Sequence, residues 1–235
     1  MLSVASWNVL HRVHAENWYE EVAARWPDEA ARSAAVAERV AALDAEVIAL
    51  QEVSGDQLAA LRAIAGDRAV HTLRYPRVPR PKRVPTVLRD RDEYLVILAD
   101  PASVPVLGAA FADDPGKGAL VVRVGECTVI ATHVTGDGRG PGQLRALADL
   151  AAAGPAVLLG DFNADRATVA AALGPEFAVA GLPPELPTRP RTGGAGKSQF
   201  IDHIVTRGAV AAGVRVLDAD GLSDHNPVCG VVSAG

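Results

Sequence analysis

Short apolar segments of the kind that form buried strands recur along this chain, and six of them carry, are directly followed by, or are directly preceded by a carboxylate, an amide or a histidine. These polar residues are Asn8, Glu52, His133, the pair Asp161/Asn163, Asp202 and the pair Asp224/His225. Stretches with helical periodicity lie between several of the apolar segments, so the sequence predicts strands and helices that alternate along the chain. Because a polar side chain at the mouth of a buried strand is costly unless something compensates it, we expect these residues to share one site.

The residue pattern predicts strands at 2–10, 47–50, 94–98, 104–107, 118–124, 127–134, 156–159, 200–206, 213–217 and 227–233. It predicts helices over 30–45, after Ser54, from Pro141 to about 151, and in a short segment that ends near 173. Ser54 and Gln57 have the spacing of a capping box. Residues 74–91 and 181–198, which are rich in Pro or Gly, are expected to be surface loops. We therefore expect residues 1–235 to form a single α/β domain with mixed sheets.

The composition restricts where and with what the protein acts. With 235 residues, of which 49% are apolar, the chain can bury a substantial core. Its net charge of −5 gives no overall electrostatic case for nucleic acid. Cys127 and Cys229 lie in apolar runs and are expected to be buried reduced thiols, which fits a cytoplasmic protein. Because the first strand signal begins at Leu2, we expect no leader segment. No apolar run approaches the ~20 residues needed to cross a bilayer, and we expect a monomer without a membrane partner.

Two pairs of polar residues have a chemical meaning of their own. Asp161 and Asn163 follow a buried strand, and an acceptor carboxylate beside an amide donor suits the orientation of a water and a phosphoryl oxygen. The alternative is an Asx-turn, with Asp165 capping the next helix. Asp224 and His225 together offer a hard oxygen ligand and a group that titrates near neutrality.

The remaining polar residues are ambiguous when each is taken alone. Asn8 is typical of a turn, and Glu52 suits either a strand mouth or the start of a helix. A lone histidine at the position of His133 is more often structural than catalytic. Asp202 lies inside an apolar strand, so it needs a partner if it is buried, and an orienting bond to a catalytic histidine would meet that need. His203 should face the other side of the strand and pack there.

Together the segments resemble the endonuclease/exonuclease/phosphatase superfamily, the group that contains deoxyribonuclease I and exonuclease III. The matching motifs, in order, are Trp7-Asn8, Gln51-Glu52, Thr132-His133, Gly160-Asp161-Phe162-Asn163, Ile201-Asp202-His203-Ile204 and Ser223-Asp224-His225. They span nearly the whole chain, and their order makes the resemblance specific. It implies an α/β fold, a four-layer sandwich of two packed mixed β-sheets flanked by helices.

The resemblance also implies a cofactor, Mg²⁺ or Mn²⁺. The ion would be held mainly by Glu52, with Asn8 and Asp224 near it. Asp92, just before the strand predicted at 94–98, stands in a context similar to that of an acid in deoxyribonuclease I. It is therefore expected to orient a catalytic group.

The same resemblance assigns catalytic roles. Asp161 and Asn163 would position water and phosphate, while His225 and His133 would handle protons and phosphoryl charge. Asp202 would orient His133. Whether Asp161 or His225 is the base that activates water stays open at this point.

The substrate is less constrained, because the superfamily cleaves DNA, RNA, nucleotide, inositol and sphingolipid phosphates. Basic side chains gather in two loops, 74–91 and 188–197, and the second contains Arg189, Arg191 and Lys197. Such residues are usually solvated loop charge, but arginine forks also bind phosphate-rich ligands.

We expect a metal-dependent phosphodiesterase that acts on DNA, RNA or a nucleotide by in-line attack of an activated water. His11 follows Asn8 closely and is expected to contact substrate, although a solvated turn is an equal alternative. A phosphomonoesterase of a small metabolite is the rival, favoured slightly by an aromatic content of only 4%. A catalytically inactive phosphate-binding module is the third reading, and the completeness of the polar set disfavours it.

Overall fold

The computed structural model describes residues 1–191 and 197–235; residues 192–196, part of the loop expected at 181–198, lie outside the described residues. The strands are β1 (Leu2–Asn8), β2 (Val47–Ser54), β3 (Ala69–Arg74), β4 (Glu93–Ala99), β5 (Val104–Phe111), β6 (Asp114–Val124), β7 (Cys127–His133), β8 (Ala156–Asp161), β9 (Phe177–Val179), β10 (Asp202–Arg207), β11 (Ala209–Val216) and β12 (Val228–Ala234). The helices are α1 (Arg12–Trp18), α2 (Glu21–Arg25), α3 (Glu29–Ala41), α4 (Gly55–Ile64), α5 (Gly140–Leu150) and α6 (Arg166–Leu173).

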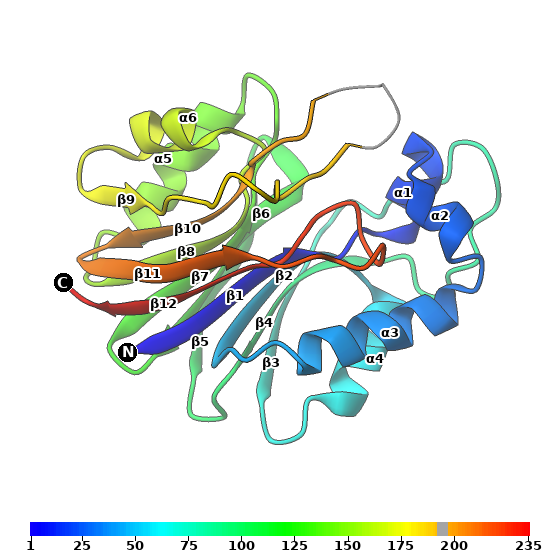
Figure 1. Ribbon diagram of the computed structural model, residues 1–235, viewed down its shortest axis with the longest axis horizontal. Helices are drawn as coiled ribbons and strands as arrows, with labels where there is room; N and C mark the ends of the chain where they lie inside the picture. The colour runs from blue at the N-terminus through cyan, green and yellow to red at the C-terminus, as the bar shows by residue number, and fades with distance from the viewer. Residues whose placement is uncertain (192–196) are drawn as a thin grey trace.

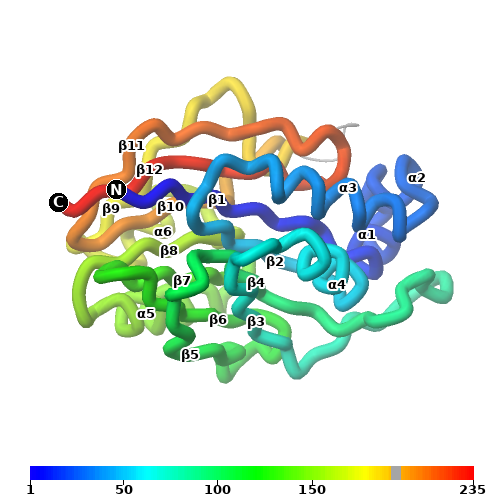
Figure 2. Tube along the Cα trace, turned by 90° about the horizontal axis from the view of Figure 1, so that it is seen from below, coloured from blue at the N-terminus to red at the C-terminus, as the bar shows by residue number. Residues whose placement is uncertain are grey.

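The strands form two six-stranded sheets (Figure 1). Sheet 1 has the order β11-β12-β1-β2-β4-β3, and sheet 2 has the order β5-β6-β7-β8-β10-β9. Each is mixed: β1 pairs with β2 and β7 with β8 in parallel, while the other pairings are antiparallel. Figure 2 shows from below how β1 and β12, from the two ends of the chain, run side by side.

Successive side chains along each strand point to opposite faces of the sheet, and this alternation separates the core between the sheets from the outer helix layers. In β2, Val47 and Ala49 face the core between the two sheets, whereas Ile48 and Leu50 face outward and pack against α3 and α4. On the other side, Leu158 of β8 faces α5 and α6. Helices therefore cover the outer faces of both sheets (Figure 1), and the expected four-layer sandwich is confirmed.

Local sequence signals explain where several helices begin. The hydroxyl of Ser54 accepts a hydrogen bond from the backbone N–H of Gln57, and the Gln57 side chain accepts one from the Ser54 N–H, so the predicted capping box is confirmed. Asp165 caps α6 by accepting from Thr168 N–H. The pattern did not reveal β3 or β9, because β3 is only half-buried and β9 has three residues.

The structure bears on two expectations, reduced cysteines and the absence of a membrane span. Cys229 is buried and Cys127 half-buried, and both are free thiols. Across the described residues, no helix combines the length and the apolar character that crossing a membrane requires.

Candidate active site

Three of the predicted site residues form one row across the end of sheet 2. In the strand register, Asp161 of β8 lies opposite His133 of β7 on one side and Asp202 of β10 on the other. Leu159, two residues before Asp161, belongs to the core between the sheets, so alternation places the row on the inner face. The row therefore faces sheet 1, where the remaining site residues lie.

Sheet 1 contributes Asn8 and Glu52. Asn8 ends β1 on the inner face, since Val4 lies in the core between the sheets. Glu52 sits in a β-bulge of β2, and its backbone has a φ of 56°, a conformation that is strained for a residue with a side chain. The bulge breaks the alternation of β2 and turns the Glu52 carboxylate into the same space as the sheet 2 row.

Asp161 is the centre of the hydrogen-bond network. Its Oδ2 lies 3.2 Å from Nδ2 of Asn8, which donates to it, and 3.3 Å from Nε2 of His133. Its Oδ1 accepts from the backbone N–H of Asn163 at 2.9 Å. The Asx-turn weighed against a functional role is thus present, and it leaves the Asn163 side chain 3.3 Å from Nε2 of His133.

His133 also contacts a residue that the sequence pattern did not single out. Nζ of Lys117, from β6, lies within hydrogen-bond distance of Nε2 of His133. Burial alone would raise the pKa of Asp161, but its interactions with His133, His225 and Lys117 hold that pKa well below its usual range. The carboxylate of Asp161 is therefore ionised inside the fold.

His225 is held by Asp202 across the two sheets. Nδ1 of His225 lies 2.9 Å from Oδ2 of Asp202, and Nε2 lies 3.8 Å from Oδ2 of Asp161. Burial lowers the pKa of His225, but the carboxylates of Asp202, Asp224 and Asp161 outweigh it and raise that pKa to about 10. Burial raises the pKa of Asp202. The backbone carbonyl of His225 accepts from the indole of Trp7 at 2.8 Å, which fixes the turn.

Asp224 is engaged by an arginine of the loop that precedes β10. Arg189 donates to Oδ2 of Asp224 from Nε at 3.0 Å and from Nη2 at 2.8 Å. Arg189 and Arg191 both donate to Oε1 of Glu20, at 3.3 Å and 3.0 Å. Two of the predicted phosphate-binding arginines are thus partly neutralised by carboxylates, and Lys197 is exposed.

A second polar group adjoins Glu52. Nε2 of His14 lies 3.1 Å from Oε2 of Glu93, a carboxylate buried at the start of β4. Burial would lower the pKa of His14, but Glu52 and Glu93 raise it. Burial would likewise raise the pKa of Glu52, but His14, His133 and Lys117 hold it well below its usual range. The site is therefore a dense network of charges of both signs.

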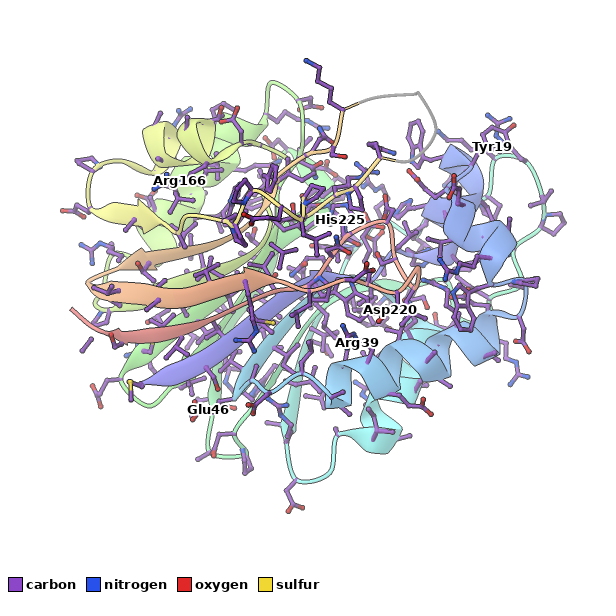
Figure 3. All side chains as sticks on the ribbon, viewed as in Figure 1. Tyr19, Arg39, Glu46, Arg166, Asp220 and His225 are labelled. Carbon is purple, nitrogen blue, oxygen red and sulfur yellow. The ribbon has the colours of Figure 1, made fainter. Side chains whose placement is uncertain are left out.

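These groups line one open cleft of about 1100 Å³. Its basic lining residues are Arg77, Arg80, Lys82, Lys117, Arg189 and Arg191, and its acidic ones are Glu20, Glu52, Asp161 and Asp224. Figure 3 shows His225 at the end of the sheets that faces α1 and α2. The cleft thus combines carboxylates, imidazoles and an excess of cations at the mouths of both sheets.

The donor atoms suit a hard divalent cation. Oδ1 of Asp224 is buried and has no hydrogen-bond partner among the described residues, and Glu52 offers a carboxylate on the same cleft. Ligand atoms of Asp161, Asp202 and His225 also lie within 4.8 Å of one another. Both oxygens of Asp202, however, contact Nδ1 of His225, so this trio is better explained as a hydrogen-bonded pair beside a carboxylate.

Three site residues make contacts that differ from those expected. Asp202 does not orient His133; its partner is His225, because the turn before β12 brings that ring over β10. His11 is buried and caps α1, with Nδ1 accepting from Val13 N–H, so it does not line the cleft. Asp92 forms an ion pair with Arg74 at 2.8 Å, away from the network.

The pattern of strand ends could not reveal Lys117, Glu93 or Glu20. Lys117 lies inside β6 between two glycines, and Glu93 begins a strand instead of ending one. Glu20 reaches the cleft from the short segment between α1 and α2.

Solved structures share the fold. One is described as D. rerio TDP2 complexed with single strand DNA product, with 14% identity, 99% of each chain covered and a TM-score of 0.71. A functionally unknown conserved protein from Enterococcus faecalis V583 has 17% identity, 100% coverage of both chains and a TM-score of 0.70. The endonuclease/exonuclease/phosphatase from Bacteroides vulgatus has 16% identity, coverage of 100% of this chain and 99% of its own, and a TM-score of 0.70.

No curated protein matches this chain in sequence. The sequence profile of the Endonuclease/Exonuclease/phosphatase family, by contrast, matches residues 5–225, from β1 to the turn that carries His225. That range includes every strand end described above. The chain therefore belongs to the endonuclease/exonuclease/phosphatase family.

Proposed function

We propose that the protein is a divalent-metal-dependent phosphodiesterase that hydrolyses nucleic acid or a nucleotide by in-line attack of water. One observation carries the proposal. His133, Asp161 and His225, with Asp202 buried behind His225, line a cleft with six basic side chains, although the protein as a whole has a net charge of −5. A cleft with so many cations suits a ligand with more than one phosphate.

Glu52 and Asp224, with Asn8 beside them, would hold Mg²⁺ or Mn²⁺. When bound, the ion supplies positive charge that neutralises the phosphoryl oxygens and the developing charge of the transition state. Oxygen donors are the ligands that both ions prefer. The free Oδ1 of Asp224 and the cleft-facing carboxylate of Glu52 support this assignment.

The ionised Asp161 carboxylate is placed to take a proton from the attacking water, and Nε2 of His225, protonated at neutral pH because its pKa is raised to about 10, is placed to donate to the same water. They lie 3.8 Å apart, so one water can contact both. Asp202 holds Nδ1 of His225, which directs Nε2 toward Asp161. In this scheme the water attacks phosphorus in line with the P–O bond that breaks, and the departing oxygen leaves with a proton from the protein or solvent.

Three side chains would donate to the phosphoryl oxygens: Lys117, Asn163 and His133. Lys117 lies against His133, and the side-chain amide of Asn163 lies 3.3 Å from the same imidazole. Their N–H groups converge beside Asp161, so negative charge that builds up on the phosphate would meet preorganised donors in a largely buried place.

The origin of the basic side chains in the cleft favours a diester over a small monoester. Arg77 and Arg80 lie on the loop before β4, while Arg189 lies on the loop before β10, so basic side chains flank the row from two separate segments. A monoester would occupy only the centre of such a cleft. The fold neighbour TDP2 is described as bound to a single-stranded DNA product, which is consistent with this choice.

A substrate panel tests the proposal. It consists of plasmid DNA, single-stranded DNA and RNA, nucleotides, inositol phosphates and a simple aryl phosphodiester, each assayed with Mg²⁺, Mn²⁺ or EDTA. The expected result is hydrolysis of nucleic acid or nucleotide diesters that stops in EDTA. Preference for monoesters would establish the rival phosphomonoesterase, and no hydrolysis of any member would favour a phosphate-binding module.

A further inference from the structure

Two adjacent aromatic side chains are exposed at the end of α1, and the first of them, Trp18, lines the cleft. Trp18 ends α1 and is 68% exposed, and Tyr19 follows it and is 70% exposed. The other tryptophans are used inside the fold, since the indole of Trp7 donates to His225 and that of Trp26 donates to Gly221. Figure 3 shows Tyr19 beside α1, on the outer side of the molecule.

Trp18 belongs to the same cleft as the catalytic candidates. It lines the cleft together with Glu52, Asp161 and His225. Aromatic residues make up only 4% of this chain, so two adjacent exposed rings at this place are unusual for it. An exposed aromatic ring at the edge of a phosphate-binding cleft offers a flat face for stacking.

A basic loop is fixed over the two rings. Asn17 donates from Nδ2 to the carbonyl of Arg80 at 3.0 Å and accepts from the backbone N–H of Lys82 at 2.9 Å. These two hydrogen bonds to the Asn17 side chain fix the loop, in which Nζ of Lys82 lies 5.1 Å from the Trp18 ring centroid. The Arg83 guanidinium lies 4.0 Å from the Tyr19 ring centroid and donates to its hydroxyl. Each ring thus has a cation over one face and most of its remaining surface open.

The charges on this loop are not neutralised by acids. Within residues 1–191 and 197–235, no ion pair involves Arg80, Lys82 or Arg83, whereas Arg77 pairs with Asp114. The rim therefore presents cations and aromatic faces together. Proteins that bind single-stranded nucleic acid use this combination, in which cations contact phosphates and rings stack on unpaired bases.

We propose that Trp18 and Tyr19 are a stacking platform for the unpaired bases of a single strand whose backbone phosphates contact Arg80, Lys82 and Arg83. The inference rests on the proposed function, because it names the form of nucleic acid that enters the cleft. An anionic lipid surface also attracts tryptophan, tyrosine and basic residues. Because one cleft is lined by both Trp18 and Asp161, it suits a single nucleic-acid strand better than a flat membrane surface.

Binding measured in EDTA tests the platform without turnover. Fluorescence anisotropy of a labelled single-stranded oligonucleotide would be recorded with the wild type, Trp18→Ala, Trp18→Phe and Val210→Ala. Val210 is an exposed apolar residue on β11 and serves as the matched control. We expect Trp18→Ala to raise Kd about tenfold, Trp18→Phe to retain most of the affinity, and Val210→Ala to change nothing. Unchanged affinity in Trp18→Ala would overturn the proposal.

An oligonucleotide series with a single abasic site identifies what Trp18 contacts. In the wild type, one abasic position should weaken binding about as much as Trp18→Ala does, and Trp18→Ala should be insensitive to it. Arg83→Ala should lower the slope of log Kd against log salt by about 0.7. Equal losses at the abasic position in both proteins, or tighter binding of duplex, contradict the platform.

Two further results separate this inference from the proposed function. If the wild type hydrolyses oligonucleotides but Trp18→Ala binds them equally well, the platform is wrong and the function stands. If Trp18-dependent binding occurs without hydrolysis of any phosphodiester in Mg²⁺, the platform stands and the function fails. Loss of binding to phosphatidylserine vesicles in Trp18→Ala, with oligonucleotide affinity unchanged, would assign the aromatic pair to a lipid surface instead.

Discussion

Nδ1 of His225 lies 2.9 Å from Oδ2 and 3.1 Å from Oδ1 of Asp202. This contact joins the turn before β12 of sheet 1 to the first residue of β10 of sheet 2. Since both carboxylate oxygens face Nδ1, that nitrogen carries a hydrogen and the ring is held with Nε2 toward Asp161. The orientation of the proposed proton-transfer group thus depends on the packing of the two sheets.

Asp202→Asn should reduce kcat about 100-fold while KM changes little. The asparagine keeps the shape but can donate to Nδ1, which would place the hydrogen of neutral His225 on Nε2. The pH–rate profile should change as well, because an acceptor charge next to the ring is lost. Asp92→Asn is the matched control, since Asp92 pairs with Arg74 away from the network. Equal kcat values for the two variants would show that the contact is only structural.

Glu52→Gln should raise the Mg²⁺ concentration that gives half-maximal activity at least about tenfold, since even residues behind the ligands of a metal have effects of that size. The amide keeps the volume of the side chain but not the charge that attracts the ion. Glu46→Gln, at the other end of β2 where Glu46 bonds to Ser3, should leave the Mg²⁺ dependence unchanged. The assignment of Glu52 fails if its variant titrates with Mg²⁺ like the wild type.

Lys117→Met should lower kcat/KM about 100-fold, since it removes a preorganised cation from the place where phosphoryl charge is proposed to build up. Arg123→Met, an exposed position on the same strand, provides the comparison. Steady-state kinetics on a single-stranded oligonucleotide distinguishes the two. An equal loss of kcat/KM in both variants would mean that β6 tolerates neither substitution, and would contradict a specific role of Lys117 in binding the phosphate.

Asp114 should make stability depend on pH in the acid range. Burial would raise its pKa, but hydrogen bonds from Gly116 and Thr135 and the charges of Arg77 and Arg139 lower it below its ordinary value of 3.8. A lowered folded-state pKa stabilises the fold above pH 3.8, and the contribution is lost as the pH falls through the folded value.

Asp114→Asn should therefore destabilise the protein by about 2 kcal/mol at neutral pH, the size of hydrogen bonds to a charged group. Urea unfolding at pH 7, 5 and 3 measures the difference from the wild type. The gap should stay constant from pH 7 to 5 and narrow below pH 4. A gap that is the same at pH 3 and pH 7 would exclude the ionised carboxylate as its cause.

The strand ends were predictable because burial leaves a simple record in the sequence. A four-residue apolar run such as Val47–Leu50 marks a buried strand. The carboxylate that follows it, Glu52, also suits the start of a helix, so its assignment to the site depends on the whole set of motifs. The capping box after Ser54 was visible for a similar reason, since it depends on residues three apart.

Contacts between distant segments leave no such record. The partner of Asp202 depends on which turn lies over β10, and alternation along one strand cannot specify that. Lys117 was hidden because its neighbour Gly118 lies so close to the chain of β5 that a Cβ would come 2.4 Å from the carbonyl of Ala109. That constraint requires glycine and gives the segment the appearance of a loop.

If His225 takes part in breaking a phosphodiester bond in this cleft, the protein without its imidazole should lose most of its cleavage activity. The most direct measurement is the initial rate of cleavage of a single-stranded oligonucleotide in Mg²⁺ by the wild type, His225→Ala and His71→Ala. His71 lies on β3 and contacts Ser103, away from the site. We expect a rate about 1000-fold lower for His225→Ala and an unchanged rate for His71→Ala. Cleavage by His225→Ala at the wild-type rate would contradict this role of His225.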